Sequence, residues 1–375
     1  MPPVPPGRPP RVAVVLTQLS FGGAEKQTFE LLRLLRGTPW EPVLVITLST
    51  IVEPYGPRIR DLGYRLEVLP RSSSLDVRRL TRTAHLLRRE KIDLVHAVHL
   101  LASGYSWLAC VGSRSRVLPT VRGTVVRPAW VKRVVYRSMF RGSRVTLVNS
   151  HRGAEFICRY FSAPSGRVTV VPNGVDFDLL RRVADPPVLR RELGLAAGSE
   201  IIGYVGKDHP VKNLDLLVHS CGELLRRRPA AHLVLIGNKL GCDRRDLLAA
   251  GLPAGRAHFL GVRTDVPALL KDMDVLALTS DSEGSPNIVL EALGVGTPVV
   301  STDVGDVRCM IDHGRTGLVV PIRDAAAMTG ALQTVLDDVE AFRRRVREGW
   351  GLLEEGFALE SMVRSTVEQW RRVLA

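Results

Sequence analysis

Apolar residues in the first half of the chain fall into short runs separated by longer amphipathic stretches. The short runs are nearly continuous, whereas the stretches between them repeat their apolar positions at helical spacing. Such strand–helix alternation is typical of a parallel sheet covered on both faces. The predicted strands cover residues 12–17, 42–48, 65–70, 93–98 and 144–150, and the predicted helices cover 25–35 and 75–90.

The same alternation starts again in the second half. Strands are predicted over residues 201–206, 232–237, 274–280 and 297–303, with helices over 213–228 and 287–296. A chain of 375 residues is long enough for two domains that each bury a core. The pattern therefore predicts an α/β protein with two Rossmann-like domains.

The connection between the two series lacks regular periodicity. Pro186, Pro187 and Gly198 interrupt it, so we place the domain boundary near residue 183. The expected parts are an N-terminal domain (1–183), a C-terminal domain (184–355) and a terminal helix (356–375). The pattern leaves open which domain this helix packs on, a return to the first domain included. Residues 1–10 are Pro-rich and are expected to form a disordered lead.

Charge is divided unevenly between the two halves. Residues 1–183 hold 29 Lys and Arg against 12 Asp and Glu, whereas residues 184–375 hold 23 against 26. The first domain is therefore expected to meet an anionic partner. Nucleic acid, an acidic membrane surface and a phosphorylated substrate all satisfy this requirement.

The sequence shows no targeting signal, and the cysteine spacing indicates no disulfide or metal site. No run of about 18 apolar residues occurs, and the N-terminus lacks the apolar core of a signal peptide, so we expect a cytoplasmic protein without a membrane-spanning helix. The cysteines have no CxxC spacing, which favours reduced and mostly buried thiols over disulfides or a zinc site. They are Cys110, Cys158, Cys221, Cys242 and Cys309.

The strongest chemical signal is the segment EGSPNIVLE at residues 283–291. It follows a predicted strand directly, at the carboxyl end where ligands bind in open α/β sheets. Ser285 is predicted as an N-cap and Pro286 as the first helical residue, so free backbone N–H groups would face a ligand. Glu283 and Glu291 offer carboxylates that accept hydrogen bonds from sugar and ribose hydroxyls. The predicted substrate-binding set here also includes Gly284, Asn287 and Ile288.

The Glu-x7-Glu spacing of this segment resembles the signature of the family 4 glycosyltransferases, which have the GT-B fold. The resemblance spans nearly the whole chain, with its parts in the family's order. It implies two Rossmann-like domains whose parallel sheets face each other across a cleft, and a reaction that retains anomeric configuration. It also implies that Glu283 contacts the donor sugar and that Glu291 binds the ribose.

A second signal is GYVGKDHPVKN, where a strand ends at Gly206 and a helix begins near Asn213. Lys207 and Lys212 bracket this loop and are expected to compensate the charge of a departing diphosphate. The segment is similar to the family's VGRLxxxKN, with Lys207 in place of the usual Arg. Lysine keeps the charge but loses the bidentate fork.

Glycines of the first domain give a third signal, because SFGGAEKQ follows the first strand. Gly22 and Gly23 allow close approach of the backbone to a ligand, and they resemble the family's N-terminal glycine loop. The full GxGxxG spacing and its ribose acid are missing, which disfavours a dehydrogenase.

One histidine lies within the predicted strand at 93–98, and a second directly follows it. The family often carries His-x-His here. This chain has His96, but Val98 stands where the second histidine usually falls, and His99 is the next residue. Either is a candidate ligand for the donor or the acceptor, and a purely structural role is an equal alternative. Arg122 is expected near the same edge, where it would bind an acceptor phosphate.

Two further segments are predicted to be mainly structural. Asn173 and Gly174 are expected to form a tight turn in VVPNGVD, bordering the substrate site. Asp272 and Asp274 imitate a metal-binding pair, but they lie just before a buried strand. We therefore predict no metal ligand and no cofactor.

A basic amphipathic helix is predicted over residues 127–144. It carries Trp130, Val134, Val135 and Met139 on or near one face, with Lys132, Arg133, Arg137 and Arg141 around it. Packing against the sheet of the first domain is the simpler interpretation. The alternative is that the helix lies on an anionic membrane surface as a peripheral contact.

These patterns together predict a retaining glycosyltransferase that uses a UDP- or GDP-sugar. Its acceptor would be a polysaccharide, a lipid-linked molecule or a small molecule. A sugar-nucleotide epimerase of the same architecture is the enzymatic alternative. A basic nucleic-acid-binding protein is the non-enzymatic alternative, but the chain contains no recognised nucleic-acid module.

Overall fold

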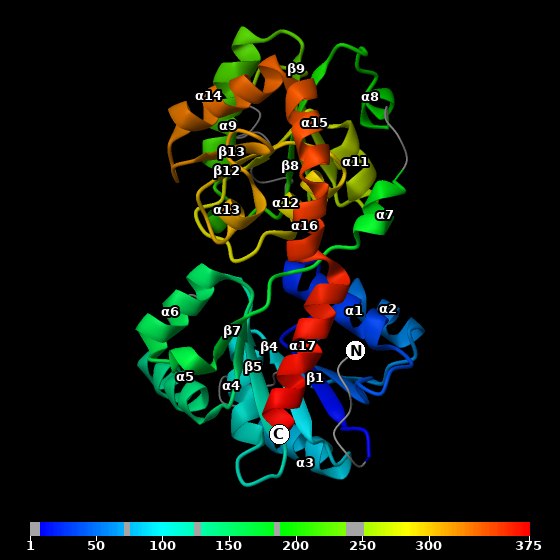
Figure 1. Cartoon of the computed structure of the whole chain (residues 1–375), viewed down its shortest axis with the longest axis vertical. Coiled ribbons are helices and arrows are strands. Elements are labelled where there is room, and N and C mark those ends of the chain that lie inside the picture. The colour runs from blue at the N-terminus through cyan, green and yellow to red at the C-terminus, as the bar shows by residue number, and fades with distance from the viewer. Residues whose placement is uncertain (1–7, 71–75, 124–128, 184–187, 238–250) are drawn as a thin grey trace. The chain divides into compact units, whose positions relative to one another are not determined.

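The computed structural model describes residues 8–70, 76–123, 129–183, 188–237 and 251–375 (Figure 1). The chain forms two compact units. The first comprises Met1–Gly174 together with Leu359–Ala375, and the second comprises Val175–Ala358. The chain therefore passes from the first unit to the second after Gly174 and returns after Ala358.

The first unit is built on a seven-stranded parallel sheet with the strand order β3-β2-β1-β4-β5-β6-β7. Its central strands are buried along their whole length because helices cover both faces. The strands are β1 (Val12–Leu16), β2 (Leu44–Thr47), β3 (Leu66–Val68), β4 (Leu94–Val98), β5 (Arg116–Val121), β6 (Thr146–Val148) and β7 (Val168–Val170).

The helices of this unit alternate with its strands. They are α1 (Gly23–Leu35), α2 (Tyr55–Asp61), α3 (Val77–Arg89), α4 (Leu100–Ala109), α5 (Trp130–Gly142), α6 (His151–Phe161), the 3₁₀ turn η1 (Ser165–Arg167) and α17 (Leu359–Leu374).

The last helix, α17, completes the core of the first unit. Its buried face, which includes Met362, Val367 and Trp370, joins the cluster formed by residues of β1, α1, β4 and β5. The rings of Trp370 and Trp40 lie 6.4 Å apart. The chain leaves the first unit after Gly174 and returns to it at Leu359, more than 180 residues later. The terminal segment thus packs on a sheet that was completed long before it in the sequence.

The second unit repeats the architecture with a six-stranded parallel sheet in the order β10-β9-β8-β11-β12-β13. The strands are β8 (Glu200–Val205), β9 (Ala231–Ile236), β10 (Ala257–Gly261), β11 (Val275–Leu278), β12 (Val299–Thr302) and β13 (Gly317–Val320).

Helices again cover both faces of this sheet, and two apolar clusters lie on its two sides. They are α7 (Phe177–Arg181), α8 (Leu189–Glu192), η2 (Pro210–Lys212), α9 (Leu214–Arg227), α11 (Val266–Asp272), α12 (Asn287–Gly294), α13 (Val307–Met310), α14 (Ala325–Asp337), α15 (Val339–Glu348) and α16 (Trp350–Phe357).

Two sequence predictions need correction at the level of single elements. The helix predicted to start with Pro286 begins at Asn287, and Pro286 takes the N-cap position with an extended ψ of 109°. In α5, Met139 is buried and Val135 is half-buried, but Trp130 and Val134 point to solvent with exposed fractions of 77% and 56%. The apolar residues of α5 therefore occupy two faces rather than one.

The cysteines are only partly as expected. Cys110 and Cys221 are buried, Cys158 is half-buried, and Cys309 is exposed. All four are free thiols, and Cys242 lies outside the described residues.

Candidate functional site

Strand order fixes where each sheet receives a ligand. In an open parallel sheet, the order reverses at one point, and the loops at the carboxyl ends of the two flanking strands diverge to leave a crevice. In the second unit this point lies between β8 and β11. The loop after β8 carries Lys207 and Lys212, and the loop after β11 carries Glu283. The topology therefore brings both predicted signals of this unit to one edge.

Lys212 is held in place by its own backbone. It ends η2, and its carbonyl oxygen accepts a hydrogen bond from Thr279 Oγ1 at 3.0 Å. Next to it, Asn213 adopts a left-handed conformation and caps α9 by accepting from Leu216 N. Its side-chain amide also donates to Asp281 Oδ1 at 2.9 Å. The loop after β8 is thus attached to the loop after β11 at several points.

Glu283 and Lys212 are in direct contact. Lys212 Nζ lies 2.6 Å from Glu283 Oε1, and Ser280 Oγ donates to the same oxygen at 2.7 Å. Both side chains keep some access to solvent, with exposed fractions of 25% for Lys212 and 15% for Glu283. An ammonium and a carboxylate are therefore available together at the point where the topology predicts a ligand.

A glycine makes this loop arrangement possible. Gly305 follows β12 with a φ of +51°, and a Cβ at this position would lie 2.0 Å from the carbonyl oxygen of Gly284. No side chain fits there. The loop of Glu283 consequently packs directly on backbone, which the hydrogen bond from Asp306 N to Gly284 O also shows.

The rest of the predicted 283–291 set lies at or under the start of α12. Gly284, Ser285, Pro286, Asn287 and Glu291 are buried, while Ile288 is half-buried. Lys207 is half-buried, and its carbonyl oxygen accepts from Tyr204 Oη at 3.3 Å. Burial, followed by the charges of Glu283 and Asp208, raises the pKa of Tyr204. This phenol therefore stays neutral beside the Glu283 carboxylate.

In the first unit the order reverses between β1 and β4. Gly22 and Gly23 follow β1, and His99 follows β4 as the N-cap residue of α4 with a φ of 75°. A positive φ is uncommon for a histidine and marks a local conformational cost. His99 Nε2 lies 3.8 Å from Glu25 Oε1.

Glu25 was missed by the sequence interpretation. It is a buried acid in the first turn of α1, and a Cβ on Gly22 would lie 2.2 Å from its Oε2. The signal was present in the sequence, because a carboxylate two residues after a glycine pair falls in the first turn of a helix, where negative charge is favourable.

His96 occupies a different environment from His99. It is fully buried in β4, with Nε2 2.8 Å from Thr120 Oγ1, and Trp370 Nε1 donates to its Nδ1 at 3.2 Å. An indole N–H can only donate, so the His96 proton resides on Nε2. Burial, aided by the Arg122 charge, lowers the pKa of His96 to about 3. This neutral ring holds α17 against the sheet, and its placement gives no support to a substrate contact.

Arg122 follows β5 at the same edge of the sheet. It is buried, Nη1 donates to Asn173 Oδ1 at 2.8 Å, and desolvation lowers its pKa to about 10. Arg122 is still charged at neutral pH. Among the described residues its buried Nε has no hydrogen-bond partner.

A second buried guanidinium, Arg79, was not predicted. It lies in α3, donates from Nη1 to Leu48 O at the end of β2, and covers the Tyr105 ring at 4.1 Å. Within the described part of the chain, its Nε and the Thr17 hydroxyl also lack partners. Arg79, Arg122 and Thr17 lie at the carboxyl ends of β2, β5 and β1, so each unfilled polar group lies along the carboxyl edge of this sheet.

The Asp272 and Asp274 carboxylates are engaged in structural contacts. Asp272 Oδ2 accepts from the backbone N–H groups of Leu189 and Arg190. Asp274 Oδ2 accepts from Ile201 N and pairs with Arg190 at 2.6 Å, while its Oδ1 pairs with Arg343. These contacts attach α8 and α15 to the sheet.

In the described ranges, no helix combines the length and apolar character that crossing a membrane requires.

Two family profiles match the chain, and each covers the ligand edge of one unit. The profile described as "Glycosyltransferase Family 4" matches residues 21–179, and "Glycosyl transferases group 1" matches residues 199–338. The chain belongs to the family 4 glycosyltransferases. Its two units are the two halves of this family's GT-B fold.

Two bacterial relatives of known name resemble part of the chain. D-inositol 3-phosphate glycosyltransferase of Nocardia farcinica is 31% identical over 289 residues, which is 70% of this chain and 64% of that protein. The protein of the same name from Corynebacterium efficiens is 28% identical, with 70% of this chain and 61% of the relative covered. The chain thus spans less than two thirds of the length of both relatives.

Solved structures of this fold include Anabaena HepE in complex with UDP-glucose. It superposes with a TM-score of 0.83 at 19% identity, covering 96% of this chain and 99% of HepE. This likeness establishes the shared GT-B architecture.

Proposed function

We propose that this family 4 member transfers a hexosyl group from a UDP- or GDP-sugar to an acceptor, with retention of configuration. The observation that carries the proposal is the contact between Lys212 and Glu283 at the strand-order reversal of the second sheet. The names of the relatives, and the UDP-glucose bound to a protein of the same fold, support it.

The donor would be held by the second unit. Lys212 and Lys207 compensate the negative charge that grows on the diphosphate as the glycosidic bond breaks. Glu283 accepts hydrogen bonds from sugar hydroxyls, and Glu291 accepts from the ribose. Without ligand, Lys212 and Glu283 satisfy each other, so donor binding exchanges one ion pair for contacts to phosphate and sugar.

The acceptor would be held by the first unit, and we propose that it carries a phosphate group. Arg79 and Arg122 are buried cations with unfilled Nε–H groups at the ligand edge of the sheet. A guanidinium binds a phosphate through two parallel hydrogen bonds, which satisfies such groups. The inositol phosphate in the relatives' name fits this requirement better than an uncharged polysaccharide end.

The proposed reaction needs neither a dedicated protein base nor a metal ion. Retention places the acceptor on the face from which the diphosphate leaves, so a donor phosphate oxygen can take the acceptor proton. His99, oriented by Glu25, binds a hydroxyl next to the reacting carbon. Positive charge from the two lysines takes the part that a divalent cation plays in other transferases, and activity should persist in a chelator.

Peripheral association with an anionic membrane is part of the proposal. In α5, Trp130, Val131 and Val134 are 77%, 54% and 56% exposed, and the helix contains basic but no acidic residues. An apolar patch beside cations suits a surface of anionic lipids. Sedimentation with phosphatidylglycerol vesicles should be lost in Trp130→Ser/Val134→Ser. Leu352→Ser, which removes a 78% exposed leucine from the second unit, is the matched control.

The first experiment is a thermal-shift panel of UDP- and GDP-sugars, because a ligand of the folded state raises its melting temperature. One nucleotide sugar should stabilise the protein and be consumed only when a phosphorylated polyol is added. Release of a modified donor without any acceptor would identify an epimerase instead. Salt-dependent DNA binding without any sugar-nucleotide response would favour the nucleic-acid alternative.

A further inference from the structure

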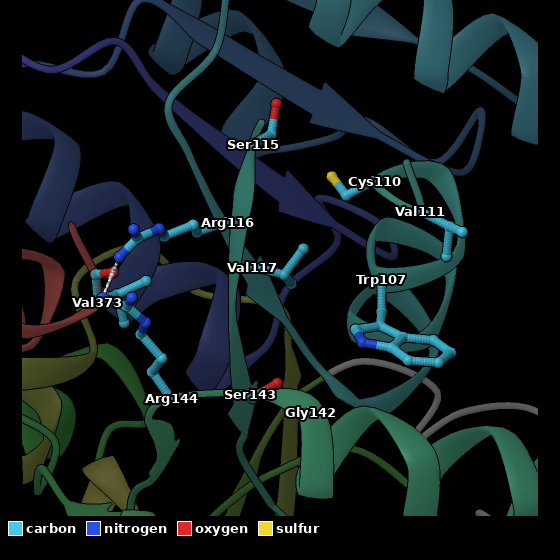
Figure 2. Close-up of a pocket in the computed structure, with 10 residues that line it drawn as sticks. All are labelled: Trp107, Cys110, Val111, Ser115, Arg116, Val117, Gly142, Ser143, Arg144 and Val373. Atoms are coloured by element: carbon cyan, nitrogen blue, oxygen red, sulfur yellow. Dashed lines mark hydrogen bonds between the residues drawn. The ribbon is translucent and has the colours of Figure 1, made fainter. Parts of the chain in front are cut away.

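A cavity of about 270 Å³ lies at the opposite edge of the first sheet, where β5 and β6 begin. Arg116 starts β5, and Arg144 precedes β6. Figure 2 shows both guanidinium groups on one side of β5, next to Val373 near the end of α17, with Trp107 and Val117 on the other side. This cavity shares no residue with the candidate site at the carboxyl edge.

The two arginines share one acceptor. Arg116 Nη1 donates to Val373 O at 2.6 Å, and Arg144 Nη1 lies 3.4 Å from the same oxygen. A guanidinium has five N–H donors. In the described part of the chain, no carboxylate pairs with either group. Most of their donor capacity is therefore unused by protein.

The sequence explains the missing counter-charge. Between Asp93 and Glu155 the chain has ten Lys and Arg but no acidic residue. Asp93, the residue before the neighbouring strand β4, is engaged with Arg8 and with Arg11 N. At the end of α17, Glu368 pairs with Arg371. A third guanidinium, that of Arg167, donates to Arg141 O and Ser143 O in the turn that carries Arg144.

Capping of α17 explains only part of this arrangement. Basic side chains do stabilise the last carbonyl groups of a helix, whose end carries about half a negative charge. Two full positive charges exceed that requirement. Burial, followed by the charge of Arg144, lowers the pKa of Arg116. Burial also raises the pKa of Cys110 to about 11, which keeps the thiol in this cavity neutral.

We propose that this cavity binds a phosphate-type dianion between Arg116 and Arg144. Its volume is below the range of about 300–1,000 Å³ typical of sites for larger ligands, so inorganic phosphate or a small phosphate monoester fits and a nucleotide does not. The dianion replaces the long Arg144 contact to Val373 O and leaves the short Arg116 contact in place. Bound anion then bridges β5, β6 and α17, which stabilises the first unit.

The test titrates the full chain with inorganic phosphate by calorimetry, against sodium chloride of equal ionic strength. Binding should be saturable, and Arg144→Gln should weaken it about tenfold or more. Arg144 is exposed, so the variant should fold. Arg114→Gln removes the same charge two residues from Arg116 but outside the cavity, and it should bind as the wild type does.

Two further arms locate the anion and its source. Phosphate binding that is lost in Arg122→Gln but kept in Arg144→Gln would assign the ion to the carboxyl edge and overturn the proposal, as would the absence of saturable binding. Glycerol 3-phosphate and vesicles containing phosphatidic acid present the same monoester. If glycerol 3-phosphate binds and its binding depends on Arg144, the natural ligand is soluble. If only the vesicles bind in an Arg144-dependent way, the ligand is a lipid headgroup. Donor binding by the second unit is measured separately, so neither result depends on the other.

Discussion

The ligand edges of the two sheets differ in how their charged groups are satisfied. At the second sheet, Lys212 is paired with Glu283, and Asp281 is bound by Asn213 and Arg323. At the first sheet, Arg79 and Arg122 are buried with N–H groups that no described residue accepts. Charges that already have partners stabilise the unliganded protein, whereas unfilled donors lower its stability and are satisfied only by a ligand.

The comparison suggests a division of labour. A paired site is ordered before the donor arrives and must exchange partners when it binds. A site with unfilled Nε–H groups gains additional hydrogen bonds from the acceptor, so it discriminates strongly against molecules that lack the matching group.

The largest effect should come from breaking the pair in the second unit. Lys212→Ala and Glu283→Gln are each expected to lower kcat by about 10²–10³-fold, because each removes a group that acts on the transition state. The measurement is product formation with the donor found in the thermal-shift panel. Asp215→Asn, an exposed change in the first turn of α9, is the control. Full activity in either site variant would refute the assignment.

An intermediate effect is expected at the unfilled edge of the first unit. Arg122→Gln should lower kcat/KM for a phosphorylated acceptor about 10–100-fold while the donor affinity stays unchanged. The melting temperature should hold or rise, since a buried cation with an unsatisfied N–H is removed. Arg89→Gln, on the exposed end of α3, should change neither quantity. A loss of stability that parallels the loss of activity would point to a structural role instead.

A smaller effect should follow from altering the backbone beneath Glu283. Gly305→Ala should lower the free energy of unfolding by about 2 kcal/mol, because of its positive φ and the close Gly284 oxygen. Gly330→Ala, in an open position inside α14, should raise it by up to about 1 kcal/mol. Chemical denaturation of both variants measures the difference, and equal stabilities would contradict the described packing.

The smallest effect concerns pH and His96. The pKa of His96 is near 3 in the folded protein and about 6.5 when unfolded, so protons bind the unfolded chain first as the pH falls. The contribution is fully present above pH 6.5 and is lost on acidification towards pH 3, amounting to about 1.4 kcal/mol by pH 5.5. Denaturation at pH 7.5 and 5.5 should show a weaker pH dependence in His96→Gln. An identical dependence would show that other groups cause it.

Most of the repeating architecture follows from the sequence, because apolar runs and helical spacing report burial directly. Strands β5, β7, β10 and β13 escaped prediction. Pro119 lies inside β5, where a central strand seldom tolerates proline, and β7 has only three half-buried residues. The start of α12 was placed one residue early, because proline fixes φ but not ψ, and Pro286 takes an extended ψ of 109°.

The candidate site was predictable where its residues lie in loops that directly follow strands, and obscure where they do not. Lys212 and Glu283 stand next to recognisable turns after strands, so topology alone brings them together. Arg79 lies on a helix among many other arginines, and nothing in its local sequence marks it as buried. The same holds for Arg116 and Arg144, whose shared acceptor, Val373, is more than 200 residues away along the chain.

The return of α17 has a consequence for biosynthesis. A ribosome releases all of the strands of the first unit, and then the entire second unit, before the helix bearing Trp370 emerges. Until then, Trp40, Leu94 and Leu118 lack their covering layer, whereas the second unit already has every segment of its core. The half that is made first is thus the half that matures last, and its exposed apolar face is where we expect chaperones to engage the nascent chain.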